Sequence, residues 1–169
     1  MKTTVTVELS KQSLEKAIKQ INSFKTNFQA GVKNSIKVAT EAMYNKVLEH
    51  CYANGISNHT DAIHWEYDEE KNIGRVWTYD WVLIFNEMGT GIIGSQNPHP
   101  NPNGAFKSWQ YDVNEHGEKG WKYPKKDGTY GWTSGLPSRH MFHDAFEDIK
   151  SELGEYIQVE LMKTNSNMY

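Results

Sequence analysis

The chain has 169 residues and a formal net charge of −3. Leucine, isoleucine, valine and phenylalanine make up only about a fifth of it, but 12% of the residues are aromatic, which is typical of a folded chain and not of a disordered one. No apolar run approaches about 18 residues, which excludes a membrane-spanning helix, and the single cysteine excludes an intrachain disulfide. We therefore expect a soluble protein of a reducing compartment, with one domain over residues 1–163 and a frayed tail over residues 164–169.

Charge is distributed unevenly along the chain. Residues 1–52 carry eight lysines against four glutamates, whereas residues 53–169 carry ten basic against seventeen acidic side chains. Ends of opposite sign would allow one subunit to stack on another, although a solvated helix face is the simpler interpretation. No run of lysine or arginine exceeds two residues, so the sequence gives little support to nucleic-acid binding.

The first third of the chain is predicted to be mainly helical. Residues 3–9 alternate threonine with valine and leucine, which is typical of a short strand. Apolar residues then recur every three or four positions for about forty residues, which predicts one very long helix, or two in series with a break at Asn22-Ser23 or Gly31. Gly55 would end the helix at no steric cost, and Cys51, on the apolar face, is expected in the core and not as a nucleophile.

The period of the apolar residues changes after this helix. Residues 63–67 and 74–79 alternate apolar and polar side chains around a polar turn, which predicts an antiparallel hairpin. Residues 81–85 are all apolar, so we expect them to be buried, either as a strand or as a short helix. Three tryptophans are expected in the core between hairpin and helices, namely Trp65, Trp77 and Trp81.

A long insert over residues 89–134 follows. Residues 89–104 are mostly glycine, proline, asparagine and serine, which predicts a long exposed loop. Residues 105–134 hold three short aromatic runs, with Asp127-Gly128 as a tight turn between the last two.

The last helix is predicted to open at Pro137-Ser138. Its apolar side chains fall on one side, and we expect the helix to be core, with full burial of Phe146. The apolar residues of this helix are Phe142, Ala145, Phe146, Ile149, Leu153, Tyr156, Ile157 and Leu161.

One group of side chains in this helix has the chemistry of a metal site. His140 and His143 lie three residues apart on one helical face, and Asp144 could ligate the metal or orient an imidazole. A third ligand, such as His116 or His99, is not fixed by the sequence, and two ordinary histidines in a first helical turn are the simpler interpretation. Neither a phosphate-binding loop nor a Gly-x-Ser-x-Gly elbow occurs. We therefore expect no catalytic, metal or cofactor site, and no enzyme.

Two short segments resemble a known family. The first is Asn86-Glu87-Met88-Gly89-Thr90-Gly91, which contains the pattern Glu-x-Gly-Thr. The second opens the last helix and fits Gly-x-Pro-x-x-x-x-Phe-x-x-Ala, with matches at Gly135, Pro137, Phe142 and Ala145. In this order, after a long helix and a hairpin, the motifs are similar to those of the tail-completion (head–tail joining, minor tail) proteins of long-tailed bacteriophages.

The resemblance implies a structural protein of the virion neck. The expected fold is α+β, a small twisted antiparallel sheet packed by a long N-terminal helix and a C-terminal amphipathic helix. Such proteins assemble in the host cytoplasm as a homo-oligomeric ring, typically hexameric, between tail-tube and head-connector proteins. Viral DNA would pass through the lumen without specific binding, and no membrane partner is implied.

A head-to-tail ring needs two different contact surfaces on each subunit. We expect these surfaces in the loop and the aromatic insert, whereas the matched residues of the second motif are expected to be structural. The candidate partner contacts are Glu87, Gly89, Thr90, Gly91, Ile92, Ile93, Trp109, Trp121 and Trp132.

Two alternatives remain open from the sequence. A cell-wall or carbohydrate-binding module would use Trp109, Trp121 and Trp132 as stacking platforms. A small metal-dependent hydrolase would be built on His140, His143 and Asp144.

Overall fold

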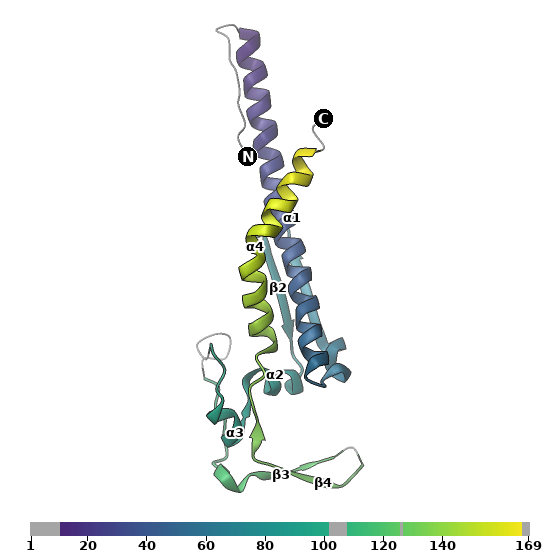
Figure 1. Ribbon diagram of the computed structural model, residues 1–169, viewed down its shortest axis with the longest axis vertical. Helices are drawn as coiled ribbons and strands as arrows, with labels where there is room; N and C mark the ends of the chain where they lie inside the picture. Colours follow the sequence, from purple (N-terminus) through teal and green to yellow (C-terminus); the bar gives the residue numbers. More distant parts are fainter. Residues whose placement is uncertain (1–10, 102–107, 126, 167–169) are drawn as a thin grey trace. The chain divides into compact units, whose positions relative to one another are not determined.

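The computed structural model describes residues 11–101, 108–125 and 127–166 (Figure 1). The fold is α+β, as predicted: α1 and α4 pack together, and two small antiparallel two-stranded sheets accompany them. The predicted strand over residues 3–9 lies outside the described residues. The elements in chain order are α1 (Lys11–Ala53), η1 (Ser57–Ala62), β1 (Ile63–Asp68), β2 (Ile73–Thr78), α2 (Trp81–Met88), α3 (Gly91–Gln96), η2 (Gly117–Lys119), β3 (Trp121–Pro124), β4 (Tyr130–Thr133), β5 (Gly135–Leu136) and α4 (Met141–Ser166).

The chain divides into two compact units. The first unit consists of residues 1–39, 67–74 and 152–169, and the second of residues 40–66 and 75–151. Each unit therefore contains part of α1 and part of α4.

α1 is one uninterrupted helix of 43 residues, without a break at Asn22-Ser23 or at Gly31. In the first unit Gly31 is buried, and a Cβ atom at this position would come within 2.7 Å of Leu161 Cδ2 in α4. The missing side chain thus permits a close helix–helix contact, and the helical hydrogen bonds keep the glycine in place despite its low helix propensity.

α1 ends where the sequence predicts. Gly55 adopts a φ of 70°, and the Ile56 N–H donates a hydrogen bond to the Cys51 carbonyl oxygen at 2.9 Å. The Asn54 side chain also donates to the His50 carbonyl at 2.9 Å. Carbonyl groups at the end of the helix are therefore satisfied within the chain.

The small sheet expected from the sequence is present as two separate hairpins. β1 and β2 form the hairpin predicted for residues 63–79. β3 and β4 pair in register from Trp121↔Thr133 to Pro124↔Tyr130, around the predicted turn at Asp127-Gly128.

The core of the second unit lies between α1, α2 and α4. Cys51 belongs to this core, as predicted, and its Sγ lies 3.8 Å from Met141 Sδ. Burial, together with the charge of Glu87, raises the pKa of the Cys51 thiol to about 11, so the thiol stays protonated at neutral pH. The buried residues of this core are Val47, Cys51, Ile56, Ile63, Leu83, Met141 and Ala145.

α2 is a helix with one buried and one exposed face. Its N-terminus is capped by Asp80, whose Oδ1 accepts a hydrogen bond from the Val82 N–H at 2.6 Å. Leu83 is fully buried, whereas Trp81 is 63% exposed, so the expectation that the whole apolar run is buried is wrong. A single surface helix can turn only one side toward the core.

Of the loop expected over residues 89–104, residues 89–101 lie within the described part of the chain, and this part is not wholly irregular. It contains the short helix α3, and His99 within it is buried. α4 begins at Met141, four residues after Pro137, and continues beyond residue 163 to Ser166.

Phe146 in α4 is 50% exposed, so the expectation that it is fully buried is wrong. Ala145 and Ile149 occupy the buried side of the helix, and the stripe is too wide for every apolar residue to face the core.

We expect this difference to be visible in stability. Met141→Ala should lower the free energy of unfolding by about 2–5 kcal/mol, because it empties space in the core. Phe146→Ala should lower it by only about 1 kcal/mol, because the residue is already half exposed to water. Urea denaturation measures both values, and equal losses would contradict the observed burial.

Candidate functional site

Two segments far apart in the sequence form one structure, which we call the motif junction (residues 86–91 and 135–145). Their backbones pair antiparallel as Thr90↔Leu136 and Gly91↔Gly135, and the Leu136 N–H also donates to Thr90 Oγ1 at 3.1 Å. Gly91 and Gly135 both have positive φ, and a Cβ atom on Gly135 would overlap the Thr90 carbonyl oxygen. Only glycine fits this close backbone crossing.

Glu87 lies in the last turn of α2 and caps the N-terminus of α4. Its Oε2 accepts a hydrogen bond from the Phe142 N–H at 2.8 Å, and its Oε1 accepts one from the His143 N–H at 3.0 Å. The cap position itself is His140, whose carbonyl accepts the first bond of α4 from the Asp144 N–H. Glu87 thus supplies from another helix the acceptor that a serine or aspartate at the cap position normally provides, and its charge complements the helix dipole.

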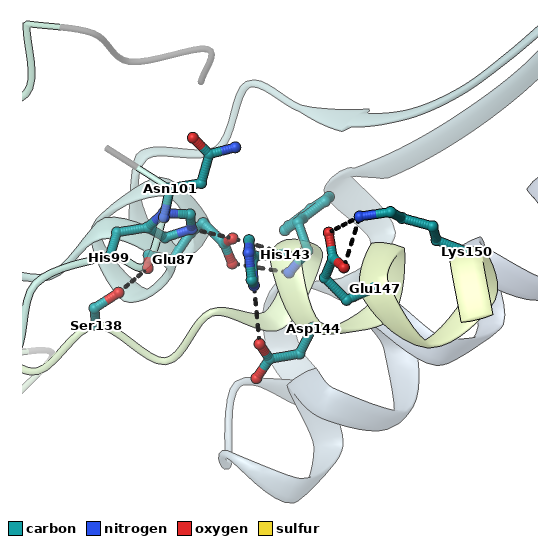
Figure 2. Close-up of polar contacts among 9 residues, drawn as sticks. Glu87, His99, Asn101, Ser138, His143, Asp144, Glu147 and Lys150 are labelled. Carbon is teal, nitrogen blue, oxygen red and sulfur yellow. Dashed lines mark hydrogen bonds and ion pairs between the residues drawn. The ribbon is translucent and has the colours of Figure 1, made fainter. Parts of the chain in front are cut away.

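A buried histidine donates a third hydrogen bond to this carboxylate (Figure 2). His99 Nδ1 accepts a hydrogen bond from the Asn101 N–H at 3.0 Å, so the ring proton lies on Nε2, which donates to Glu87 Oε1 at 3.0 Å. The His99 N–H donates to the Tyr111 hydroxyl oxygen at 3.1 Å. Glu87 is only 8% exposed, and three donors compensate the loss of water around its charge.

The residues just before α4 bind the end of α2 and the end of α1. The buried Ser138 hydroxyl donates to the Glu87 carbonyl oxygen, and the Arg139 N–H donates to the Asn86 carbonyl oxygen at 2.7 Å. The Arg139 guanidinium also donates to the carbonyl and side-chain oxygens of Asn54, at 3.0 and 2.9 Å. The start of α4 is therefore fixed by backbone and side-chain contacts to two other helices.

Three imidazoles gather at the junction. The ring centroid of His99 lies 5.5 Å from that of His140 and 5.3 Å from that of His143, with the planes nearly perpendicular. Burial lowers the pKa of His140, which favours its neutral form. In the part of the chain that the structure describes, no three His, Cys, Asp or Glu side chains are arranged to hold a metal ion.

A cavity of about 530 Å³ opens beside the Glu87–His99 pair. Glu87, His99, Asn101 and His143 are among its polar lining residues, and it has the size to hold an apolar side chain or a small molecule. Three donors from the chain already bind the Glu87 carboxylate beside this cavity. The other lining residues are Val76, Trp77, Thr78, Ile84, Met88, Phe142 and Phe146.

A second, larger hollow contains the three tryptophans predicted as contacts. This aromatic cleft, of about 1450 Å³, is lined by Trp109, Trp121 and Trp132 together with Trp81 and Phe85. The Phe85 ring lies between those of Trp81 and Trp109, at centroid distances of 5.7 and 6.0 Å. His116, considered as a third metal ligand, lies here as well and contacts Asp112.

The structure divides the predicted contact residues into buried and accessible ones. Glu87, Gly89 and Gly91 are buried in the motif junction, where their roles are internal. Ile93 is 38% and Trp132 60% exposed. Thr90, Ile92, Trp109 and Trp121 are partly buried.

The four residues predicted to be structural lie in the junction or beside it. Gly135 forms the backbone crossing, and Ala145 is fully buried in the core. Phe142 packs against that core and supplies one of the capped N–H groups. Pro137 is half-buried, between β5 and the capped turn.

Sequence reasoning missed the roles of His99 and Asn101. Both lie in a run of proline and asparagine that carries no periodic apolar signal. The contact of His99 with Glu87, twelve residues earlier, depends on how the chain folds back after α3 and is not marked by any sequence pattern.

Comparison of the chain with family models, with curated proteins and with solved structures found no match. Residues 11–101, 108–125 and 127–166 include no helix long and apolar enough to cross a bilayer.

We expect removal of the Glu87 carboxylate to destabilise the second unit. Glu87→Ala leaves two N–H groups of α4 and the His99 Nε2–H without their acceptor, and should cost about 2–4 kcal/mol. Glu87→Gln retains one acceptor oxygen and should cost about 1–2 kcal/mol.

The matched control is Glu49→Ala, on the exposed side of α1, which should change stability by less than about 0.5 kcal/mol. Chemical denaturation measures all three variants. A loss for Glu87→Ala no larger than that of the control would show that the carboxylate does not hold α4.

Proposed function

We propose that this chain is a structural virion protein that forms a homo-oligomeric ring at the head–tail interface of a tailed bacteriophage. The observation that carries the proposal is the motif junction, because the two segments on which the resemblance rests are bound to each other. Glu87 of the first motif caps the helix that contains Phe142 of the second, and Thr90 crosses Gly135. The residues of the two motifs are in physical contact and depend on one another. This supports the resemblance more strongly than two short matches without any contact would.

The exposed surfaces support an assembling protein. Leu14 and Ile18 near the start of α1 are 48% and 57% exposed, and Trp81 and Trp132 in the aromatic cleft are 63% and 60% exposed. Large apolar side chains at the surface mark interaction sites, and a head-to-tail ring needs two different ones on each subunit. The proposed neighbours are further copies, tail-tube proteins and head-connector proteins, with viral DNA passing through the lumen without specific binding.

One observation favours a second candidate, a carbohydrate-binding module. Trp109, Trp121 and Trp132 line the same cleft, as a stacking site for sugar rings requires. Ser108, Gln110 and Asn114 supply polar groups in the same lining.

Direct observation of the oligomer tests the first candidate. Mass photometry and negative-stain electron microscopy of the purified protein, alone and with tail tubes of the same virus, should reveal a closed ring, six subunits being the expected number. Trp132→Ala should weaken the ring or its binding to tubes, while the control Tyr79→Ala, 81% exposed and outside the cleft lining, should not. A protein that stays monomeric with and without tail tubes would contradict the proposal.

Binding to cell-wall glycans tests the second candidate. If the chain is a carbohydrate-binding module, the monomer should bind glycan fragments, and the Trp132→Ala variant should no longer bind them. Absence of glycan binding by the folded wild-type protein excludes this candidate.

A further inference from the structure

The N-terminal part of α1 carries an exposed apolar stripe. Leu14, Ile18, Ile21, Lys25 and Phe28 follow one another at steps of four and three residues, so they lie on one side of the helix. The four apolar members are between 47% and 57% exposed. Half-exposed side chains of this size at heptad spacing are typical of a helix that packs against another helix. We call these five residues the α1 stripe.

Charge restricts what can cover the α1 stripe. Residues 11–28 carry Lys11, Lys16, Lys19 and Lys25 against a single acidic residue, Glu15. Pairing of this segment with the same segment of another copy, parallel or antiparallel, would bring lysines against lysines. The charges therefore favour a partner helix with acidic residues along its contact face.

α4 presents a face of this kind. Glu152, Glu155, Val159 and Met162 follow at steps of three, four and three residues and form a second stripe, the α4 stripe. Val159 is 48% and Met162 50% exposed, and Glu155 is exposed. Leu161, which lies against α1 in the same copy, points to a different side of the helix. The α4 stripe is therefore accessible while α4 packs on its own α1.

We propose that the α1 stripe of one copy docks antiparallel on the α4 stripe of the next copy. In this orientation Leu14 and Ile18 lie against Met162 and Val159, and Lys25 lies beside Glu152. From Leu14 to Lys25 and from Glu152 to Met162 each stripe extends about 16 Å, so the two match in length.

The contact is heterologous, since each copy offers a different surface to each neighbour, and its repetition builds a ring when the rotation between copies closes. This inference rests on the proposed ring function, and it identifies the contact between subunits.

A charge swap tests the contact. Lys25→Glu or Glu152→Lys alone should weaken self-association at least about tenfold at low salt, and the double variant should restore it, because the pair is re-formed with opposite signs. The matched control is Lys37→Glu, which makes the same charge change at an exposed position of α1 outside the stripe. Mass photometry measures association, and circular dichroism verifies that each variant is folded.

Disulfide trapping provides a second measurement that does not depend on charge. Copies with Ile18→Cys mixed with copies with Val159→Cys should form a cross-linked dimer under oxidising conditions, and neither variant alone should do so. Cys51 does not compete, because it is fully buried.

The outcomes separate this inference from the proposed function. A wild-type oligomer that Lys25→Glu leaves intact and that gives no mixed disulfide overturns the docking of the two stripes and leaves the ring in place. A wild-type protein that remains monomeric overturns the ring as well. Binding of wild type, but not of Lys25→Glu, to anionic phosphatidylserine vesicles, with no effect on association, would assign the α1 stripe to a lipid surface instead.

Discussion

The second unit depends on a buried carboxylate that belongs to one helix and caps another. Glu87 lies in the last turn of α2, and its two oxygens accept hydrogen bonds from the Phe142 and His143 N–H groups at the start of α4 and from His99. Burying a charge is costly unless donors replace the lost water, and here three of them do. By fixing the first turn of α4, the carboxylate also fixes Met141, which closes the core around Cys51.

The motif junction explains why these residues are unsuited to contact a partner directly. Its backbones cross at Gly91 and Gly135 without room for a side chain, and Glu87 is almost inaccessible. The junction instead positions surfaces next to it: the Trp109 indole N–H donates to the Gly89 carbonyl at 3.0 Å, which anchors the aromatic cleft. In the proposed ring the motif supports the contact surfaces, and the exposed aromatic and apolar side chains form them.

The helices and strands of the fold were largely predictable, because the spacing of apolar residues within one short segment indicates whether that segment is a helix or a strand. The long helix, its end at Gly55, the first hairpin and the turn at Asp127-Gly128 all follow from local sequence. The exposure of Phe146 and Trp81 was not predictable, since an apolar residue at the edge of a stripe can face either the core or the solvent. The hydrogen bonds between Glu87 and the start of α4 were unpredictable for a different reason, because they join segments more than fifty residues apart in the chain.

The most direct test of this account is native-state hydrogen exchange of the Phe142 and His143 amides, followed by NMR. First-turn amides of a helix normally lack an acceptor and exchange quickly. If Glu87 caps α4, both amides should be protected from exchange nearly as well as the Ala145 amide in the wild type. In the Glu87→Gln variant at least one of the two amides should exchange much faster. Fast exchange of both amides in the wild type, at the rate of an uncapped helix end, would contradict the central role of the carboxylate.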